Sequence, residues 1–453
     1  MKRYFNNKII QRAIVFTVVI ALFIFYSWKG LIETGVSADV ARDLTQVSNL
    51  WLHKIIWLGP NLGIGFPISP LYFYLLYPFL LISGGNGYSL VITEAFFAFV
   101  ALSIFAWYQL KKSFSSALIG VLVIGLAPWW ITASAFVWNG NMYVSWILMG
   151  LVLLWYRLPL ILPALMFGIA ISIHPMAVLV LPLLCYEWLA RDKKIINFLS
   201  CVLGLALPWA PILLFEIITK GYLTRQWLAH PSTSGVHLAF NLGNVGQIVQ
   251  NIGAPIFGGI LLWGATFWVA EKREKMWILF ISLSLVLVLF VSNLLHYYLY
   301  GLICAILFII VIVWSGKKVG QFGLVVLILV SIFSIKIPFD VPIRTIGRLN
   351  TIVKTIIREQ KLDTSKKYAV ASLNEGTRNA PQADDYRFFL RTNGLKAVDL
   401  EKNSEADFLI LFVEAPQLDW RKYENWNIQQ FGSRKIISTN KIDGMIVVLY
   451  GKK

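Results

Sequence analysis

The chain has 453 residues, of which 58% are hydrophobic and only 14% are charged. A water-soluble protein of this composition would expose more apolar surface than such proteins tolerate, so a soluble fold is excluded. The formal net charge of +17 is distributed along the chain and forms no basic stripe, which argues against a nucleic-acid partner. We interpret the chain as a polytopic α-helical membrane protein surrounded by membrane lipids.

Apolar runs close to the length that crosses a bilayer recur throughout residues 1–336. The three cysteines lie inside these runs, so neither a metal motif nor a disulfide framework is expected. About eleven of the runs are predicted to be transmembrane helices: 9–28, 88–110, 117–134, 142–156, 158–173, 176–190, 195–217, 254–270, 276–293, 296–314 and 319–336.

The basic residues of this part predict its orientation. Of the 21 Lys and Arg residues in 1–336, 15 fall at the N-terminus or in every second connection, and six fall in the other connections. Cytoplasmic loops are enriched in Lys and Arg, so we expect a multi-pass protein of the plasma membrane with a cytoplasmic N-terminus. With eleven crossings, everything beyond the last span lies outside the cytoplasm.

Two of the outer connections are long. The first, 29–87, contains apolar residues at helical spacing between Val40 and Leu58 and a second apolar run at 71–82. Counting that run as a span would invert the charge alternation, so we place it as an interfacial or re-entrant helix. The second connection, 218–253, is polar and of the kind that often closes over a site.

The composition changes after the last span. Residues 337–364 are interpreted as a linker punctuated by prolines, and 365–453 as a small extracytoplasmic α/β domain. Within that domain we expect three strands and one helix, the strands at 368–373, 408–413 and 444–450 and the helix at 384–393.

Polar groups on the outer side are few, which makes the pair Asp39 and Asp43 conspicuous. They lie four residues apart in a helix-like segment, with Arg42 between them, so both carboxylates share one helix face. Such a pair can supply a general base or hold a divalent cation, and two like charges so close raise one pKa. An equally simple alternative is an amphipathic helix whose carboxylates face water.

Further candidates lie at the outer ends of spans. His174 precedes a proline in an apolar context, where an ionisable group suggests function, although a histidine bonded to a backbone carbonyl is the alternative. His296 could face an outer cavity or belong to an aromatic belt at the interface. Arg225, in the second long connection, could contact a phosphate or belong to an ordinary exposed loop. Three residues after the third span could bind sugar hydroxyls or cap the next helix: Trp138, Asn139 and Asn141.

Taken together, four segments resemble the GT-C superfamily of membrane glycosyltransferases, in the branch with protein mannosyltransferases, bacterial aminoarabinose transferases and bacterial lipopolysaccharide glycosyltransferases. The segments are 38–43 (ADVARD), 59–76 (ending SPLYFYLL), 136–141 (FVWNGN) and 173–175 (IHP). The resemblance covers about the first 190 residues and rests on the combination, since no single motif is highly specific.

The resemblance implies an inverting transfer of a sugar from a polyprenyl-phosphate donor to a glycan, lipid or protein acceptor on the outer face of the membrane. Asp39 occupies the position of the family's catalytic aspartate. The family often has Asp-Glu there, whereas this chain has Asp39-Val40, so a role of the second acid is absent or shifts to Asp43. Metal dependence therefore stays open, with Asp39 and Asp43 as the ligands if a divalent cation is present.

The other candidates take the remaining roles of such a reaction. Departure of the donor phosphate needs cationic partners. The candidates, in order of preference, are Arg42, Lys54, His174 and Arg225. The candidates for binding sugar or acceptor are Trp138, Asn139, Asn141 and His296. Two alternatives from other classes are a polyprenyl-lipid flippase or secondary transporter, which would favour paired broken spans, and a non-catalytic membrane scaffold.

Overall fold

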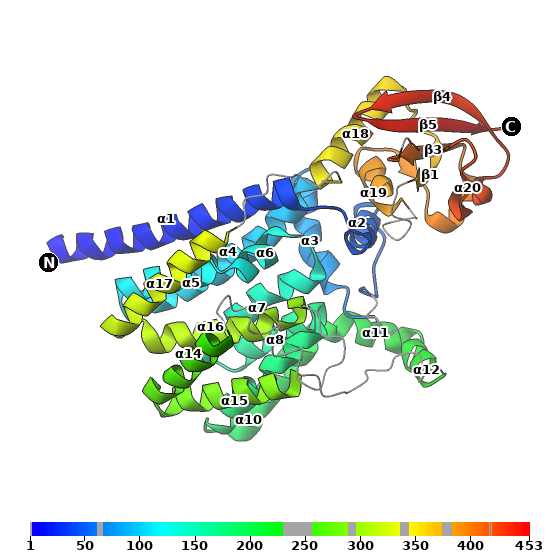
Figure 1. The fold of residues 1–453 in the computed structure, drawn as a ribbon. Coiled ribbons are helices and arrows are strands. Elements are labelled where there is room, and N and C mark those ends of the chain that lie inside the picture. Colours follow the sequence, from blue (N-terminus) through cyan, green and yellow to red (C-terminus); the bar gives the residue numbers. More distant parts are fainter. Residues whose placement is uncertain are drawn as a thin grey trace. The chain divides into compact units, whose positions relative to one another are not determined.

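The structure of the protein is a computed structural model, and it describes residues 2–60, 67–229, 256–288, 296–335, 344–373, 383–415, 417 and 419–453. The chain divides into two compact units (Figure 1). The first, which we call the helical unit, consists of Met1–Gly30, Trp57–Tyr72 and Thr93–Pro338. The second, the sheet unit, consists of Leu31–Ile56, Phe73–Ile92 and Phe339–Lys453.

Helices account for almost all of the regular structure in the helical unit, and two of them, α1 and α4, continue into the segments of the sheet unit. Short 3-10 turns precede or join some of these helices: η1 (Pro175–Val180), η2 (Leu207–Trp209) and η3 (His296–Leu299). The α-helices are α1 (Lys2–Glu33), α4 (Tyr88–Leu110), α5 (Phe114–Gly125), α6 (Pro128–Ala135), α7 (Asn139–Trp155), α8 (Ile161–Ile173), α9 (Leu181–Leu189), α10 (Lys194–Ala206), α11 (Ala210–Ile218), α12 (Tyr222–Ala229), α14 (Ile256–Val269), α15 (Lys272–Val288), α16 (Tyr300–Trp314) and α17 (Lys318–Ser334).

Within the described residues, three helices are long and apolar enough to cross a bilayer: Asn7–Glu33, Tyr88–Leu110 and Lys194–Ile218. The pair α5 and α6 adds a fourth candidate, bent by 69°. Pro128 begins α6, and because proline has no N–H the hydrogen-bond ladder of α5 cannot run on unbroken. Helical structure occupies each of the eleven predicted spans, but most of these helices are shorter than a full crossing, so the number eleven stays a prediction.

The core of the helical unit is built around α7 and α16, whose residues are buried along almost their whole length. α8 packs on α7 and on α10. A side chain at Gly168 of α8 would place its Cβ 2.8 Å from the carbonyl oxygen of Gly204 in α10. Small residues of this kind allow helices to approach closely where no hydrophobic effect drives them together.

A buried ion pair joins three helices of this unit. Glu187 of α9 accepts hydrogen bonds from Arg273 Nε of α15, at 2.8 Å, and from Trp277 Nε1, at 2.9 Å. Arg273 also donates to the carbonyl oxygen of Trp155, so it caps the last turn of α7. Sequence patterns did not identify this pair, because its partners are 86 residues apart.

The C-terminal half of the sheet unit contains a five-stranded mixed sheet of order β2-β1-β3-β5-β4. The strands are β1 (Lys367–Leu373), β2 (Lys396–Ala397), β3 (Phe408–Val413), β4 (Arg434–Ile442) and β5 (Met445–Lys452). β1 pairs in parallel with β2 and β3, whereas β5 runs antiparallel to β3 and β4. Asp443 and Gly444, both with positive φ, form the tight turn that a two-residue hairpin between β4 and β5 requires. The predicted α/β character and the three predicted strands are confirmed.

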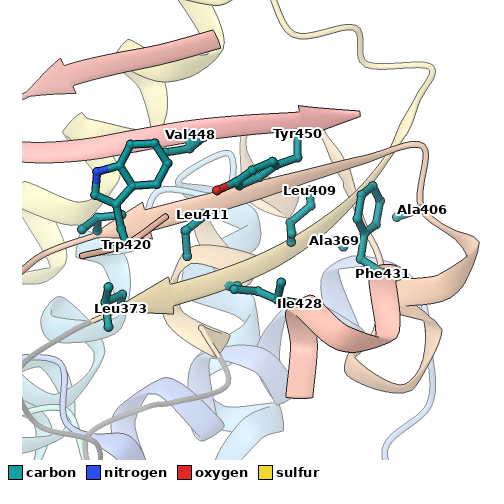
Figure 2. Close-up of a cluster of buried hydrophobic side chains, with 12 residues drawn as sticks. Ala369, Leu373, Ala406, Leu409, Leu411, Trp420, Ile428, Phe431, Val448 and Tyr450 are labelled. Atoms are coloured by element: carbon teal, nitrogen blue, oxygen red, sulfur yellow. The ribbon is translucent and has the colours of Figure 1, made fainter. Parts of the chain in front are cut away.

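One face of the sheet is covered by an apolar core (Figure 2). Leu409 and Leu411 of β3 and Val448 of β5 point from the sheet towards Ile428 and Phe431 of α20 (Trp426–Phe431). Alternate residues of a strand project to the same face, which is why every second residue of β3 enters this core.

The first long connection also contributes to the sheet unit. The connection contains α2 (Ala38–Trp51) and α3 (Leu71–Ile82), and the sheet unit includes α2 and most of α3. α2 packs on α19 (Asp384–Thr392) of the C-terminal half. A backbone bridge between Gly35 and Thr345 joins the two stretches of chain. Residues Ile346–Glu359, inside the segment that we interpreted as a linker, form helix α18, with Thr345 as its N-cap. The apolar residues of α18 recur with the 3.6-residue period of a helix and are buried, so α18 packs against the rest of its unit through one face.

Candidate active site

Asp39 and Asp43 lie on α2, whose sequence determines how they are presented. Ser37 caps the helix by accepting a hydrogen bond from the backbone N–H of Val40. The apolar residues Val40, Leu44 and Val47 are almost fully buried and fix one face of α2 within the sheet unit. The predicted amphipathic helix is thereby confirmed for this segment. Asp39 lies outside this buried face, and its side chain is 53% exposed.

The Arg42 guanidinium bridges the two carboxylates. Its Nη1 lies 2.9 Å from Asp39 Oδ1, and its Nη2 lies 2.8 Å from Asp43 Oδ1. Asp43 is only 4% exposed, and its second oxygen, Oδ2, has no hydrogen-bond partner among the described residues. The two carboxylates therefore differ sharply in environment, although both bind the same cation.

Burial raises the pKa of Asp43 to about 7, and attraction to Arg42 only partly offsets the effect. The nearby Asp39 carboxylate adds a smaller increase. The expectation that one of the two pKa values is raised agrees with this result, but the main cause is burial and not repulsion between like charges. Near neutral pH, Asp43 exchanges between its charged and neutral forms, and in the neutral form it holds Arg42 less strongly.

We expect the melting temperature of Asp43→Asn to rise relative to that of the wild type as the pH rises from 4 to 8. In the folded wild type the pKa is raised from 3.8 to about 7, so the folded state binds more protons than the unfolded state within this window. Wild-type stability is therefore lost as the pH rises, whereas asparagine carries no charge at any pH. Thermal unfolding of the purified chain across this range measures the effect. Asp419→Asn, at an exposed position, is the control, and a difference independent of pH would contradict the prediction.

A divalent cation fits poorly between these two carboxylates. Arg42 occupies the position that faces both of them. Within the part of the chain that the structure describes, no group of three or more His, Cys, Asp or Glu side chains could hold a metal ion. Calcium and magnesium take six or more oxygen ligands, of which two carboxylates supply only a part.

Lys54 lies beyond the other end of α2 and is bonded elsewhere. Its Nζ forms an ion pair with Asp399 Oδ2, at 2.9 Å. Asp399 also accepts a bond from Arg391 Nη2, at 2.7 Å. Burial would raise the pKa of Asp399, but the hydrogen bonds from Lys54 and Arg391 outweigh it and hold the pKa below its usual range. The structure therefore groups Lys54 with the C-terminal half of the sheet unit and not with Asp39.

A second group of predicted residues assembles in the helical unit, where three helix junctions meet. The backbone N–H of Trp138 donates to Glu94 Oε1 of α4, at 3.3 Å. Asn139, at the start of α7, donates to the carbonyl oxygen of Ile173, the last residue of α8. Asn141 Nδ2 donates to the carbonyl oxygen of Phe136, at 2.9 Å, so this amide orders the junction between α6 and α7.

His174 completes this group. Its ring stacks on Tyr143 of α7, with centroids 4.9 Å apart, and lies 5.2 Å from the ring of Tyr298 in η3. Neither of these tyrosines was among the predicted site residues, and Glu94 was not among them either. Contacts between junctions so far apart in sequence leave no local pattern. His296 begins η3, but its side chain lies outside the described residues.

Arg225 lies on α12 in the helical unit. Its Nη2 donates to the carbonyl oxygen of Thr219, at 3.1 Å, across the turn between α11 and α12. Glu216 accepts bonds from the same turn, from the backbone N–H of Leu223 and from the hydroxyl of Thr224. Most of the second long connection, residues 230–253, falls outside the described residues.

Comparison with solved structures identifies the fold. The chain is similar to ArnT from Cupriavidus metallidurans bound to undecaprenyl phosphate, with a TM-score of 0.58 and 11% identity over 96% of this chain and 97% of that one. The apo state of the same protein matches with a TM-score of 0.53 and 12% identity over the same shares of the two chains. The arabinofuranosyltransferase AftD from Mycobacteria covers 97% of this chain but only 39% of its own, with 12% identity and a TM-score of 0.48. No protein-family model and no curated protein matches the sequence.

The class of the protein follows from these observations. It is a mostly helical membrane protein with a small C-terminal mixed sheet, and its fold is similar to that of ArnT. The fold that the resemblance implies is confirmed.

Proposed function

We propose that this chain is an inverting glycosyltransferase, which moves a sugar from a polyprenyl-phosphate donor to an acceptor on the outer face of the plasma membrane. The main support is the likeness of fold, over 96% of this chain, to a protein bound to undecaprenyl phosphate. A lipid-linked donor keeps its tail in the bilayer and presents its sugar at the surface. The apolar helices and the exposed acid of α2 suit a reaction at that boundary.

Asp39 is the proposed general base. It takes the proton of the acceptor hydroxyl while that oxygen bonds to the anomeric carbon of the donor sugar. The bond between that carbon and the phosphate oxygen breaks on the opposite side, and the polyprenyl phosphate leaves with the electron pair. Asp39 is exposed enough to meet an acceptor, and its bond to Arg42 orients the carboxylate.

Stabilisation of the leaving phosphate falls to cationic groups, among which Arg42 is the strongest candidate because it adjoins Asp39. Arg42 shares its charge with Asp43, so protonation of Asp43, whose pKa is about 7, leaves more of that charge for a phosphate. Lys54, His174 and Arg225 remain candidates for this role. Each has another partner in the structure, namely Asp399, the tyrosine rings and Thr219.

Binding of the sugar or acceptor is proposed for the second group, Trp138, Asn139 and Asn141, together with His296. The amides of Asn139 and Asn141 bond to backbone carbonyls at the end of α8 and at the junction between α6 and α7, and so hold these two places together. We add Glu94 to this group, because its carboxylate is held at the same junction. The group therefore combines a buried hydrogen-bond acceptor with stacked aromatic rings, and small-molecule sites usually contain both.

The test is transfer of labelled sugar from a panel of polyprenyl-phosphate sugars to acceptors in membranes that carry the chain, compared with membranes that lack it. We expect chain-dependent incorporation from at least one donor, with release of polyprenyl phosphate in equal amount. No transfer from any donor, together with accelerated movement of labelled polyprenyl phosphate between the leaflets of reconstituted vesicles, would replace the proposal by a lipid flippase.

A further inference from the structure

The sheet unit contains a cavity of about 460 Å³ that is distinct from the surroundings of Asp39. Its wall is formed by the end of α2, by the starts of strands β1 and β2, and by the turn η4 (Leu400–Glu405). Lys367 and Lys396 begin β1 and β2 and are paired in register. Paired residues of neighbouring strands project to the same face, so both lysines border the same cavity.

Positive charge predominates in this cavity. Five cationic side chains and two carboxylates line it: Lys54, Lys367, Arg391, Lys396, Lys402, Asp399 and Glu405. Both carboxylates already have cationic partners. Asp399 lies between Lys54 and Arg391, and Glu405 lies 3.5 Å from Lys367. Neither Lys396 nor Lys402 forms an ion pair with a carboxylate among the described residues. Lys396 Nζ donates to the uncharged carbonyl oxygen of Ser365, at 3.3 Å, so the charges of both ammonium groups can neutralise a bound anion.

The wall of the cavity also has an aromatic side. Trp51, the last residue of α2, lines it together with Leu52 and Leu395. The tryptophan ring packs against Gly85, where an added Cβ would lie 3.2 Å from Trp51 Cη2. Gly85 has a φ of 86°, a conformation that residues with a side chain rarely adopt. Because glycine has no side chain, the Trp51 ring can pack directly on the backbone at this position.

We infer that this cavity binds an anionic saccharide, with the acidic group at Lys396 and Lys402 and a sugar ring against Trp51. A phosphate or carboxylate forms charge-assisted hydrogen bonds with lysine, and the C–H face of a sugar ring packs on an aromatic surface. The cavity is large enough for a small-molecule ligand. The uncharged alternative, a neutral glycan, leaves the excess of positive charge without a partner.

The inference deepens the proposed function and rests on it for one point, which is that the saccharide is part of the acceptor. Trp51 and Asp39 are twelve residues apart on α2, about 18 Å along the helix axis. A sugar in the cavity is therefore not the one that reacts at Asp39. The acceptor is extended, and a part remote from the reacting hydroxyl contributes binding energy here.

Binding is tested separately from transfer, on the purified full chain in detergent. The probe is a fluorescent oligogalacturonate of about six residues, with a malto-oligosaccharide of the same length as the neutral control. We expect saturable binding of the charged probe at least tenfold tighter than that of the neutral one. The double variant Lys396→Ala with Lys402→Ala should weaken binding of the charged probe at least tenfold, and Trp51→Ala should weaken both probes. Lys422→Ala, a lysine that is 87% exposed and outside the cavity, is the matched control.

Several results would overturn the inference. They are equal binding of the two probes, unchanged affinity in the double variant, and equal loss of affinity in Lys422→Ala. Competition by inorganic phosphate as strong as that by oligogalacturonate would show an ion site and not a saccharide site. Because no sugar is transferred in this assay, failure here leaves the proposed reaction untouched, and failure of the transfer assay leaves this binding site untouched.

Discussion

Replacement of Asp39 by asparagine is expected to lower the turnover number by about 10²- to 10⁴-fold, the usual contribution of a positioned general base. Asparagine keeps the shape of the side chain but cannot accept the proton of the acceptor hydroxyl. The Michaelis constants should change little, because the lost function is exercised only in the transition state. Initial rates of transfer at equal concentrations of purified protein measure this effect.

The control for folding comes from the same helix. The ion pair between Arg42 and Asp39 is exposed, so its loss should cost no more than about 1 kcal/mol of stability. The melting temperature of Asp39→Asn should therefore stay close to that of the wild type. Asp43→Asn keeps the proposed base and should retain most of the activity. Full activity of Asp39→Asn with loss of activity in Asp43→Asn would assign the base to Asp43 and contradict the proposal.

The largest expected effect on stability is that of Arg344→Ala. Arg344 forms ion pairs with Asp385 and Glu414, and Tyr386 donates a further bond to Glu414. Asp385 is fully buried and Glu414 is 10% exposed, so removal of Arg344 leaves two buried carboxylates without their cation. Loss of one partner of a buried pair costs about 3 to 5 kcal/mol. Proteolysis of the full chain during titration with denaturant measures unfolding of the sheet unit.

Two further measurements make this prediction specific. Arg348→Ala removes an exposed pair with Asp443 and should cost no more than about 1 kcal/mol. Burial raises the pKa of Asp385 and of Glu414 even with Arg344 present, so without it both should accept protons more readily in the folded state. A folded state that binds more protons gains stability as the pH falls. Arg344→Ala should thus be less destabilised at pH 5 than at pH 8, and equal destabilisation at both would count against the role of charge.

The candidate site could be predicted only in part from the sequence. The capped start of α2 and its apolar spacing are local features, so Asp39 and Asp43 could be located on one helix from residues within one turn of each other. Which carboxylate is buried could not be predicted, because it depends on the surroundings of α2 in the folded chain. The proximity of Glu94 to Trp138 could not be predicted either, because 44 residues separate the two in the sequence.

The sequence alone predicts the membrane character of the chain, the helical structure of its apolar runs and the α/β character of its C-terminal part. These follow from apolar runs, the 3.6-residue period and strand alternation, which act over a few neighbouring residues. Only the tertiary structure decided that α18 lies inside the expected linker as a packed helix and that Arg391 reaches Asp399 and Ser48. Charge pairing and burial depend on tertiary contacts between distant segments, and a single sequence carries no local signal of those contacts.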